Sequence, residues 1–403
     1  MTLQPISRQR QMVNVAGLVF NVAYLTFALL IPLDALHLHM PLWLVGVLTA
    51  IPGVLQLPTR LVSGPLVDWR GERWVLVLTF WLSLSGALIV LVGYRLPATA
   101  LVAGQLAIGA ARGFFWTAAQ SEVTRGGGNR ARYLGVFTSY TKGGALLGMA
   151  AAGGLAQTVG IRGGFALSAL LSLSSLVLAI ALKPAPRNAR RAFGFLSALR
   201  LLWPVAHRPF VIVNGLVALL CAIPQALALS FDPVILVRLG LLDWQASLLT
   251  ALSMVGMIIG GLCGSLAIQL LGLVRLIAGS SGLIVLSLAL TTIARVPSMA
   301  VAIFLGGLAA GWLNVAFLTT VTERSQEGER GTNLAVTQVF FVLAMMLTPL
   351  ISGWLFNAAG QTIAFVLEAL VAALVAGVAL MLWPWQARSE PYEARIDSGD
   401  SRV

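Results

Sequence analysis

The fold of this chain is indicated by a short charged stretch, GPLVDWRGER (residues 64–73), which separates two apolar runs, 42–67 and 74–94. Each run is long enough to cross the hydrocarbon core of a bilayer, which takes about 20 apolar residues in a helix. The same alternation continues along all 403 residues, of which 58% are hydrophobic and 10% charged, with a mean hydropathy of +0.91. A soluble domain carries about 25% charged residues, so the sequence predicts a protein that crosses a membrane many times.

Apolar runs bounded by charges, proline and glycine predict twelve transmembrane helices. In the first half they fall near 11–34, 42–67, 74–94, 98–122, 133–157 and 163–182. In the second half they fall near 209–236, 244–271, 274–294, 298–322, 332–357 and 361–382. The two sets repeat each other, since Gly17-Leu18-Val19 matches Gly215-Leu216-Val217 and Asp34 falls on Asp232 at the same offset.

The predicted fold class is an all-α membrane protein, with twelve transmembrane helices in two pseudo-symmetric six-helix bundles around a central cavity. The expected domains are an N-terminal bundle (1–182), a cytoplasmic linker (183–208), a C-terminal bundle (209–385) and a cytoplasmic tail (386–403). Parallel six-helix halves place a substrate site near the bilayer midplane, between the halves.

The positions of the basic residues predict the orientation. With the N-terminus inside, nineteen of the 26 Lys and Arg residues fall in inner segments, and four fall in outer ones: Arg95, Arg162, Arg238 and Arg295. Because cytoplasmic loops carry the excess of Lys and Arg, we expect both termini in the cytoplasm and the protein in the inner membrane. The net charge of +12 belongs to these loops, and no basic run resembles a nucleic-acid-binding arm. Cys221 and Cys263 lie inside apolar runs, which predicts no disulfide and no metal site.

Residues 64–73 resemble the G-x-x-x-D-x-x-G-x-R loop signature of the major facilitator superfamily. The resemblance extends over residues 10–385. It implies the family fold, in which two six-helix bundles rock around a central cavity in alternating access.

The same resemblance implies a charge latch at the cytoplasmic end, in which Asp68, Arg73 and Glu122 stabilise the outward-open state. Gly64 and Gly71 are expected to allow close packing and a sharp turn there. The alternative is that these charges are ordinary residues of the membrane interface.

Residues 144–154 in the fifth span are similar to the glycine-rich signature of the family's proton-coupled exporters, although Met149 replaces its proline and Ala152 one glycine. The alternative is close helix packing through small residues. Packing would also explain a second run of small residues in the eighth span, at Gly256, Gly260 and Gly264.

Polar residues at spacings of three and four form stripes on the first, second, fourth and fifth spans, which line the cavity in this fold. The expected substrate-binding residues of this half are Asn21, Tyr24, Gln56, Arg60, Arg112, Trp116 and Lys142. Arg112 and Lys142 lie deep in their spans, where a charge costs at least about 2.5 kcal/mol and indicates a functional site. A structural ion pair is the alternative, but no carboxylate lies at matching depth on those four spans.

The second half lacks these cations, since Arg112 falls on Gly311 and Lys142 on Phe341 when the repeats are aligned. Its expected substrate-binding residues are Gln225, Met257, Asn314 and Phe341. Methionine and aromatic side chains here could be ordinary packing or an adaptable apolar wall. A cationic wall that faces an apolar one would suit an amphiphile with an acidic or polar head.

Three acidic residues are candidates for proton coupling or for a periplasmic gate. Asp34 and Asp232 lie at the outer ends of the first and seventh spans, where loop capping is the alternative. Glu368 is central in the twelfth span, as a proton site or as a packing residue.

These features predict a secondary transporter and not an enzyme, because no GxSxG, HExxH or Walker-type motif is present. The favoured function is proton-coupled export of amphipathic compounds, either drug-like or lipid-like. The alternative is proton-coupled uptake of a small organic anion, with Arg112 and Lys142 as the carboxylate clamp. The expected partners are the lipid bilayer, the substrate and protons, with no cofactor, no nucleic acid and a monomeric chain.

Overall fold

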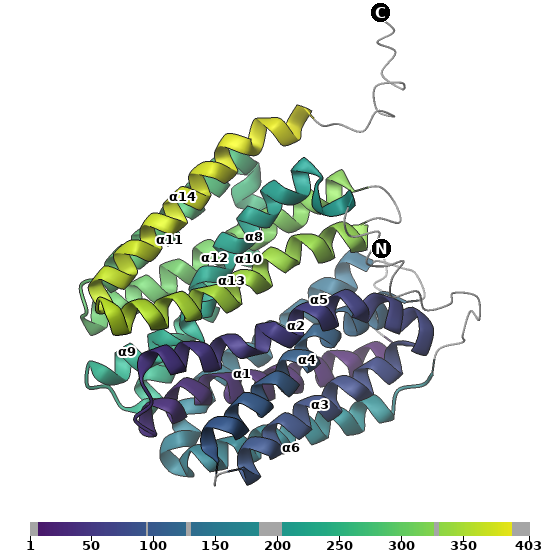
Figure 1. The fold of residues 1–403 in the computed structure, drawn as a ribbon. Coiled ribbons are helices and arrows are strands. Elements are labelled where there is room, and N and C mark those ends of the chain that lie inside the picture. The colour runs from purple at the N-terminus through teal and green to yellow at the C-terminus, as the bar shows by residue number, and fades with distance from the viewer. Residues whose placement is uncertain (1–6, 94–95, 126–129, 185–203, 326–329, 389–403) are drawn as a thin grey trace, which may run out of the picture.

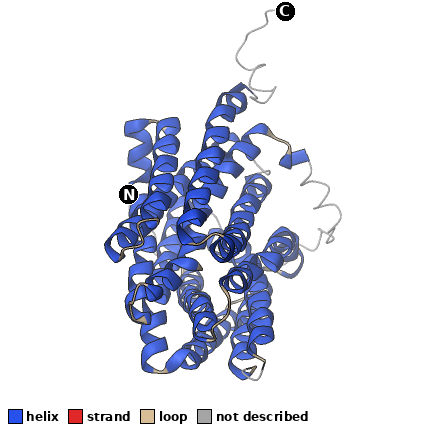
Figure 2. Ribbon diagram, turned by 60° about the vertical axis from the view of Figure 1, so that its left-hand side comes forward, coloured by secondary structure: helices blue, strands red, loops and turns tan. Residues whose placement is uncertain are grey.

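The computed structural model describes residues 7–93, 96–125, 130–184, 204–325 and 330–388, and every regular element in these ranges is a helix (Figure 2). The first half contains α1 (Arg8–His37), α2 (Leu42–Arg70), α3 (Glu72–Val92), α4 (Pro97–Thr124), α5 (Arg130–Thr158) and α6 (Gly160–Ile180). The second half contains α8 (Pro209–Ala228), α9 (Phe231–Arg238), α10 (Asp243–Leu271), α11 (Leu273–Thr291), α12 (Val296–Arg324), α13 (Arg330–Ala358) and α14 (Gln361–Arg388).

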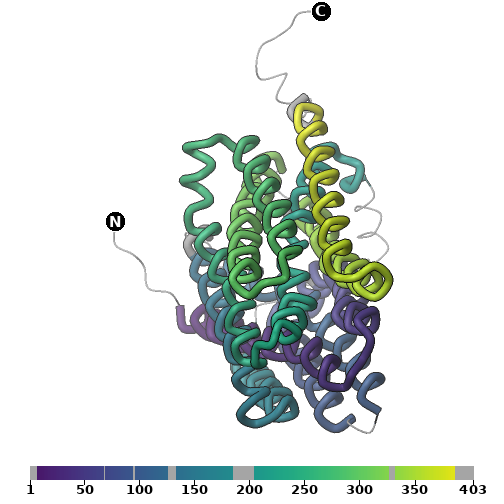
Figure 3. The backbone as a smooth tube through the Cα atoms, turned by 90° about the vertical axis from the view of Figure 1, so that its left-hand side faces the viewer, coloured from purple at the N-terminus to yellow at the C-terminus, as the bar shows by residue number. Residues whose placement is uncertain are grey.

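The two halves pack by the same plan. In the first half α1 packs against α5 and α6, and α2 packs against α4; in the second half α8 packs against α13, and α10 against α12. Figure 1 shows the purple-to-blue half below the green-to-yellow half, and the tube in Figure 3 shows the same two bundles from the side. The twelve-helix fold expected from the hydropathy is confirmed. The predicted linker 183–208 lies mostly outside the described residues.

Eleven candidate membrane spans, with α8 and α9 counted as one, are long and apolar enough to cross a bilayer. The helix α5 is 29 residues long but is not among these eleven spans, because its glycine, serine, threonine and lysine residues lower its hydropathy. Exposed tryptophans lie near both ends of the helices, as is typical of membrane interfaces: Trp69, Trp74 and Trp385 at one end, and Trp43, Trp244 and Trp354 at the other.

We call the first of these ends the Arg-rich end, because Arg8, Arg10, Arg70, Arg73 and Arg125 lie there, where α1 begins and α2 and α4 end. The other end is the opposite end. The charge count predicts that the Arg-rich end is cytoplasmic.

The seventh span, expected to be continuous over 209–236, is broken. The helix α8 ends at Ala228 and α9 begins at Phe231, while the backbone at Ser230 leaves the helical region, with φ −129° and ψ −74°. Pro233 explains the position of the break, because a proline ring clashes with the carbonyl four residues earlier and has no N–H to bond it. That carbonyl belongs to Leu229.

Close helix packing shows how the two repeats correspond. A Cβ atom added at Gly113 would lie 2.8 Å from a backbone oxygen of α2, and one added at Gly311 would lie 2.5 Å from a backbone oxygen of α10. Gly113 and Gly311 are therefore equivalent, and Arg112 corresponds to Ala310 instead of Gly311. The expected alignment was wrong by one residue, but the second half still has no cation at this place.

The turn after α2 uses Gly71, whose φ of +85° is in the region that favours glycine. Gly272 makes the equivalent turn after α10 with φ +78°. The expected close packing at Gly64 is wrong, because a Cβ atom there would meet nothing within 4 Å.

The small residues of α5 have a packing role. A Cβ atom at Gly144 would overlap the Leu18 carbonyl of α1, and one at Gly148 would lie 2.6 Å from the Val22 carbonyl. The run Gly256, Gly260 and Gly264 packs against α12 in the same way. Close packing therefore accounts for both runs, whatever else the α5 segment does.

Candidate substrate-binding site

The two halves meet at the opposite end. There α2 packs on α13 so closely that a Cβ atom at Gly353 would lie 3.1 Å from the Gly46 Cα atom, and Gly153 of α5 packs on the Asp243 backbone of α10. The His37 imidazole of α1 also contacts the Asp243 carboxylate across the halves, with 3.1 Å between Nε2 and Oδ2. These contacts close the space between the halves at this end.

The stripe on α5 becomes exposed toward the Arg-rich end. Lys142 is partly buried, whereas Ser139 and Gly135, one and two turns nearer to that end, are exposed. This face of α5 is therefore less covered by the second half toward the Arg-rich end.

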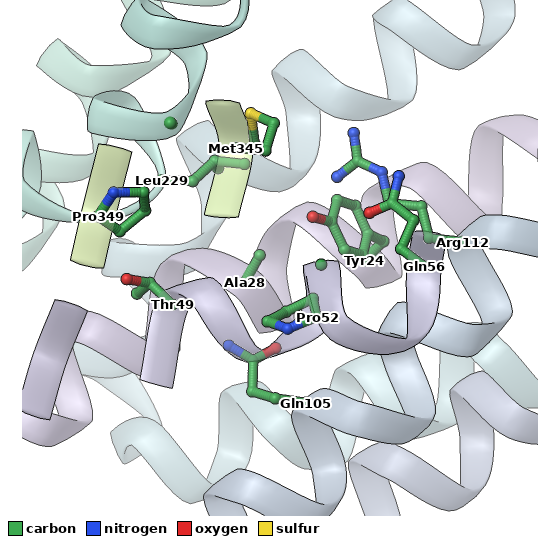
Figure 4. A pocket seen from close by; sticks show the side chains of 12 residues that line it. Tyr24, Ala28, Thr49, Pro52, Gln56, Gln105, Arg112, Leu229, Met345 and Pro349 are labelled. Carbon is green, nitrogen blue, oxygen red and sulfur yellow. The ribbon is translucent and has the colours of Figure 1, made fainter. Parts of the chain in front are cut away.

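A cavity lies between the halves at mid-depth, in two adjacent parts that share the lining residues Arg112 and Leu229. The first part is lined by Tyr24, Ala28, Thr49, Pro52, Gly53, Gln56, Gln105, Arg112, Ala226, Leu229, Met345 and Pro349. The second is lined by Asn21, Leu25, Arg112, Trp116, Thr141, Lys142, Ala145, Met149, Gln225, Ala228, Leu229, Ser253 and Met254. We call the two parts together the central cavity. Figure 4 shows Arg112 and Gln56 beside the Tyr24 ring, with Met345 and Pro349 on the other side.

Arg112 and Lys142 lie on the first-half wall of the central cavity, whereas Arg60, which was also expected there, does not line it. The Arg112 guanidinium carbon lies 4.3 Å from the centroid of the Tyr24 ring, which is a cation–π contact. Lys142 and Arg60 each lie close enough to Arg112 for their positive charges to repel it. Within the described residues none of these three cations forms an ion pair with a carboxylate.

The Lys142 ammonium instead approaches the second half, with 3.3 Å between its Nζ atom and the Met257 Sδ atom. A thioether sulfur is a weak acceptor, so Lys142 remains able to bind a better one. A structural ion pair was the alternative role for Arg112 and Lys142. In the described part of the chain neither side chain has a carboxylate partner.

Amides complete the polar wall, each anchored by one backbone hydrogen bond. Asn21 donates to the Gly17 carbonyl at 2.8 Å, and Gln225 donates to the Cys221 carbonyl at 3.3 Å. Gln105 donates to the Leu48 carbonyl at 3.1 Å, and its own buried Oε1 atom has no partner among the described residues. Gln105 and Thr49 were not among the expected binding residues, although both belong to the polar stripes.

The second-half wall is mostly apolar. Gln225 lines it as predicted, whereas the other predicted residues of this half do not. Asn314 and Phe341 do not line the central cavity, and Phe341 packs against the hydrophobic core. Met345 and Pro349, one and two turns further along α13, line it instead. Met257 does not line the central cavity, but its sulfur contacts the Lys142 ammonium, which does.

The predicted latch residues make contacts within the first half. Glu122 pairs with Arg125 at 2.6 Å, and Arg125 also pairs with Glu72 of α3. Arg73 donates to a backbone carbonyl of α6 at 2.8 Å. The Asp68 side chain lies outside what the structure describes, so the latch stays a prediction.

The candidate acidic residues lie in different surroundings. Asp34 is only partly buried and interacts electrostatically with His37 and Arg162 at the opposite end. Asp232 and Glu368 are 5% and 7% exposed and interact with each other, and Ser352 donates a hydrogen bond to Glu368. Asp34 and Asp232 therefore match in the sequence repeat but lie in different environments.

Comparison with known proteins places this architecture in a family. The sequence profile of the Major Facilitator Superfamily matches residues 13–244 and 217–400. Among curated proteins, none matches the chain significantly.

Three solved structures illustrate the fold. A mutant of the nucleoside transporter NupG has a TM-score of 0.78 and 12% identity, covering 93% of this chain and 100% of its own. A POT family transporter in complex with 5-aminolevulinic acid has a TM-score of 0.78 and 14% identity, covering 94% and 96%. The human organic anion transporter MFSD10 has a TM-score of 0.68 and 18% identity, covering 93% and 100%.

Proposed function

The chain belongs to the Major Facilitator Superfamily, and on that premise we propose that it is a proton-coupled secondary transporter of amphipathic compounds with an anionic head group, working by alternating access. We further propose that it exports them across the cytoplasmic membrane. The single observation that carries the substrate class is the pair of cations that line the central cavity, Arg112 and Lys142, with no carboxylate partner among the described residues.

Electrostatics explains why such a site favours an anion. Each cation at membrane depth costs free energy, and the repulsion by Arg112 adds to the cost at its two neighbours. An anionic group between Arg112 and Lys142 would supply the missing opposite charge and accept charge-assisted hydrogen bonds, the strongest kind in proteins. The apolar surface from Leu229, Met254, Met345 and Pro349 would then contact the rest of the substrate.

The names of the structural relatives point to different ligands. Their names specify a nucleoside, 5-aminolevulinic acid and organic anions. At 12–18% identity they share a fold with this chain, so the substrate has to be argued from the side chains of the cavity. Those side chains agree best with the organic anions.

The direction of transport rests on the resemblance of residues 144–154 to the exporter signature. Because these residues also pack helices together, uptake by anion–proton symport remains the second candidate. The same pair, Arg112 and Lys142, would clamp the anion in either direction. The charge moved in each cycle separates the two, since symport of one monovalent anion with one proton is electroneutral and their exchange is not.

The test is flux into proteoliposomes made with the purified full chain. Octyl sulfonate is a suitable probe because it stays charged at all accessible pH values and does not cross the bilayer as a neutral acid. We expect protein-dependent, pH-gradient-driven flux of octyl sulfonate and little flux of octyltrimethylammonium, which has a similar tail and the opposite charge. Equal flux of the two probes, or a preference for the cation, would contradict the proposed substrate class. Membrane-potential dependence of the sulfonate flux would then separate exchange from symport.

A further inference from the structure

An aromatic cluster in the second half brings α9, α13 and α14 together. The ring centroids of Phe231 and Phe356 lie 4.6 Å apart, and those of Phe356 and Phe365 lie 5.3 Å apart, both pairs edge to face. Such contacts fix the three helices relative to one another.

A polar group lies beside this cluster. Asp232 follows Phe231 directly, Ser352 lies one turn before Phe356, and Glu368 lies one turn after Phe365. The Ser352 hydroxyl donates to Glu368 Oε1, whereas Glu368 Oε2 is buried without a partner among the described residues. Both carboxyl groups are more than nine-tenths buried.

No cation compensates these two carboxyl groups within the described residues. The electrostatic interactions of Glu368 are with Asp232 and Ser352. Described arginines of the second half lie at helix ends, namely Arg208, Arg238, Arg275, Arg295 and Arg324. The other acidic residues on the packed helices are Asp243, which contacts His37, and the exposed Glu323, while Cys221 of α8 interacts with Lys142. Two neighbouring buried carboxylates without a cation are not both stable in the charged form.

The group is also joined to the central cavity through the chain. Asp232 is in the first turn of α9, three residues after Leu229, which lines both parts of the cavity. The break between α8 and α9 lies between these two residues. A change of charge beside Asp232 would therefore act on the segment that forms the apolar wall.

We propose that Asp232, Ser352 and Glu368 form one proton-binding site, separate from the substrate cavity, in which Glu368 binds the proton beside the charged Asp232. The proton comes from water and adds to a carboxylate oxygen without any other bond changing. This inference rests on the proposed function, in which it makes this site the proton carrier and leaves Asp34 outside it. Ser352 is a positioning residue that stabilises the charged form of Glu368 by its hydrogen bond.

The test observes the proton itself and needs no substrate. Infrared difference spectra of the full chain in lipid, recorded between about pH 6 and about pH 9, report protonated carboxyl groups by their carbonyl stretch, while exposed carboxyl groups stay ionised in this window. We expect one carboxyl band in the unmodified protein and its loss in Glu368→Gln. Glu323→Gln is the matched control, because Glu323 is an exposed carboxylate of the same half, and it should leave the band unchanged.

Two further variants shift the site in opposite directions. Asp232→Asn removes the repelling charge and should move the midpoint of the band down by about one pH unit. Ser352→Ala removes the donor to the charged form and should move the midpoint up. Survival of the full band in Glu368→Gln, or equal midpoints in all variants, would overturn the proposal.

A sodium arm tests the competing ligand. The spectra are repeated with sodium in place of choline, and we expect no change. Loss of the band on sodium addition would show a cation site instead of a proton site and would overturn the inference. Failure here leaves octyl sulfonate flux unaffected, whereas absent flux with an intact band would count against the proposed function alone.

Discussion

Replacing either deep cation of the central cavity by methionine should weaken the binding of an anion but not of its neutral analogue. Arg112→Met and Lys142→Met each remove a charged hydrogen-bond donor, which is worth about 1.5–3 kcal/mol. That range corresponds to about 10- to 150-fold in the dissociation constant. We expect the larger loss at Arg112, because its guanidinium is planar and already held on the Tyr24 ring, so binding costs it less side-chain entropy.

The assay is calorimetric titration of the purified variants with octyl sulfonate and with octyl methyl sulfone, which has the same tail and no charge. The sulfone should bind the two variants and the unmodified chain within about twofold, because it lacks the charge-assisted bonds. Lys183→Met is the matched control, since Lys183 is exposed at the end of the first bundle. Equal losses for sulfonate and sulfone would mean that the cations act on the fold and not on the ligand, and would refute the cationic site.

Three further outcomes follow from the contacts at the two ends. Gly153→Leu should push α5 away from α10 and increase labelling of cysteines placed at the opposite end, whereas Gly154→Leu, which meets open space, should not. His37→Ala removes a contact with Asp243 whose histidine is 51% exposed, so it should shift that labelling by no more than about fivefold, the effect of about 1 kcal/mol. Arg125→Ala leaves Glu72 and Glu122 without their shared cation, and a lower thermal midpoint at neutral pH that recovers in acid is expected; an unchanged midpoint would contradict the pairing.

The fold was predictable because bilayer thickness translates directly into the length of an apolar run. The break in the seventh span was not, because a proline near the outer end of the first span of each half has opposite outcomes. The helix α1 continues through Pro32, whereas the chain breaks just before Pro233. Whether a proline bends or breaks a helix depends on what the neighbouring helices offer to the freed carbonyl, and that is a tertiary property.

The site was predictable on one wall only. Charged residues are so rare inside membranes that Arg112 and Lys142 stand out in a stripe, and both line the central cavity. An apolar lining residue such as Met345 looks in sequence like a packed one such as Phe341, and only the rotation of α13 separates them. The opposite-end pair, His37 and Asp243, gave no signal because its partners are far apart in the chain.

The sign of the coupling between the two proposed sites provides the last prediction. Among the buried groups that the structure describes, Arg112 and Lys142 of the first half have no carboxylate partner, and Asp232 and Glu368 of the second half have no cation partner. Direct electrostatics would let a bound anion favour a proton at Glu368, which is the behaviour of a symporter. Exchange requires the opposite, namely that the break between α8 and α9 makes the proton and the anion compete.

Because coupling between binding sites is reciprocal, octyl sulfonate must shift the carboxyl band midpoint in one direction or the other. Under the proposed export we expect the midpoint to fall when octyl sulfonate is added at saturation, and not to move with octyl methyl sulfone. Arg112→Met should abolish the shift while the band itself remains, because the anion is then bound weakly. A rise of the midpoint would contradict exchange and favour uptake by symport, since the anion would then be holding the proton in place.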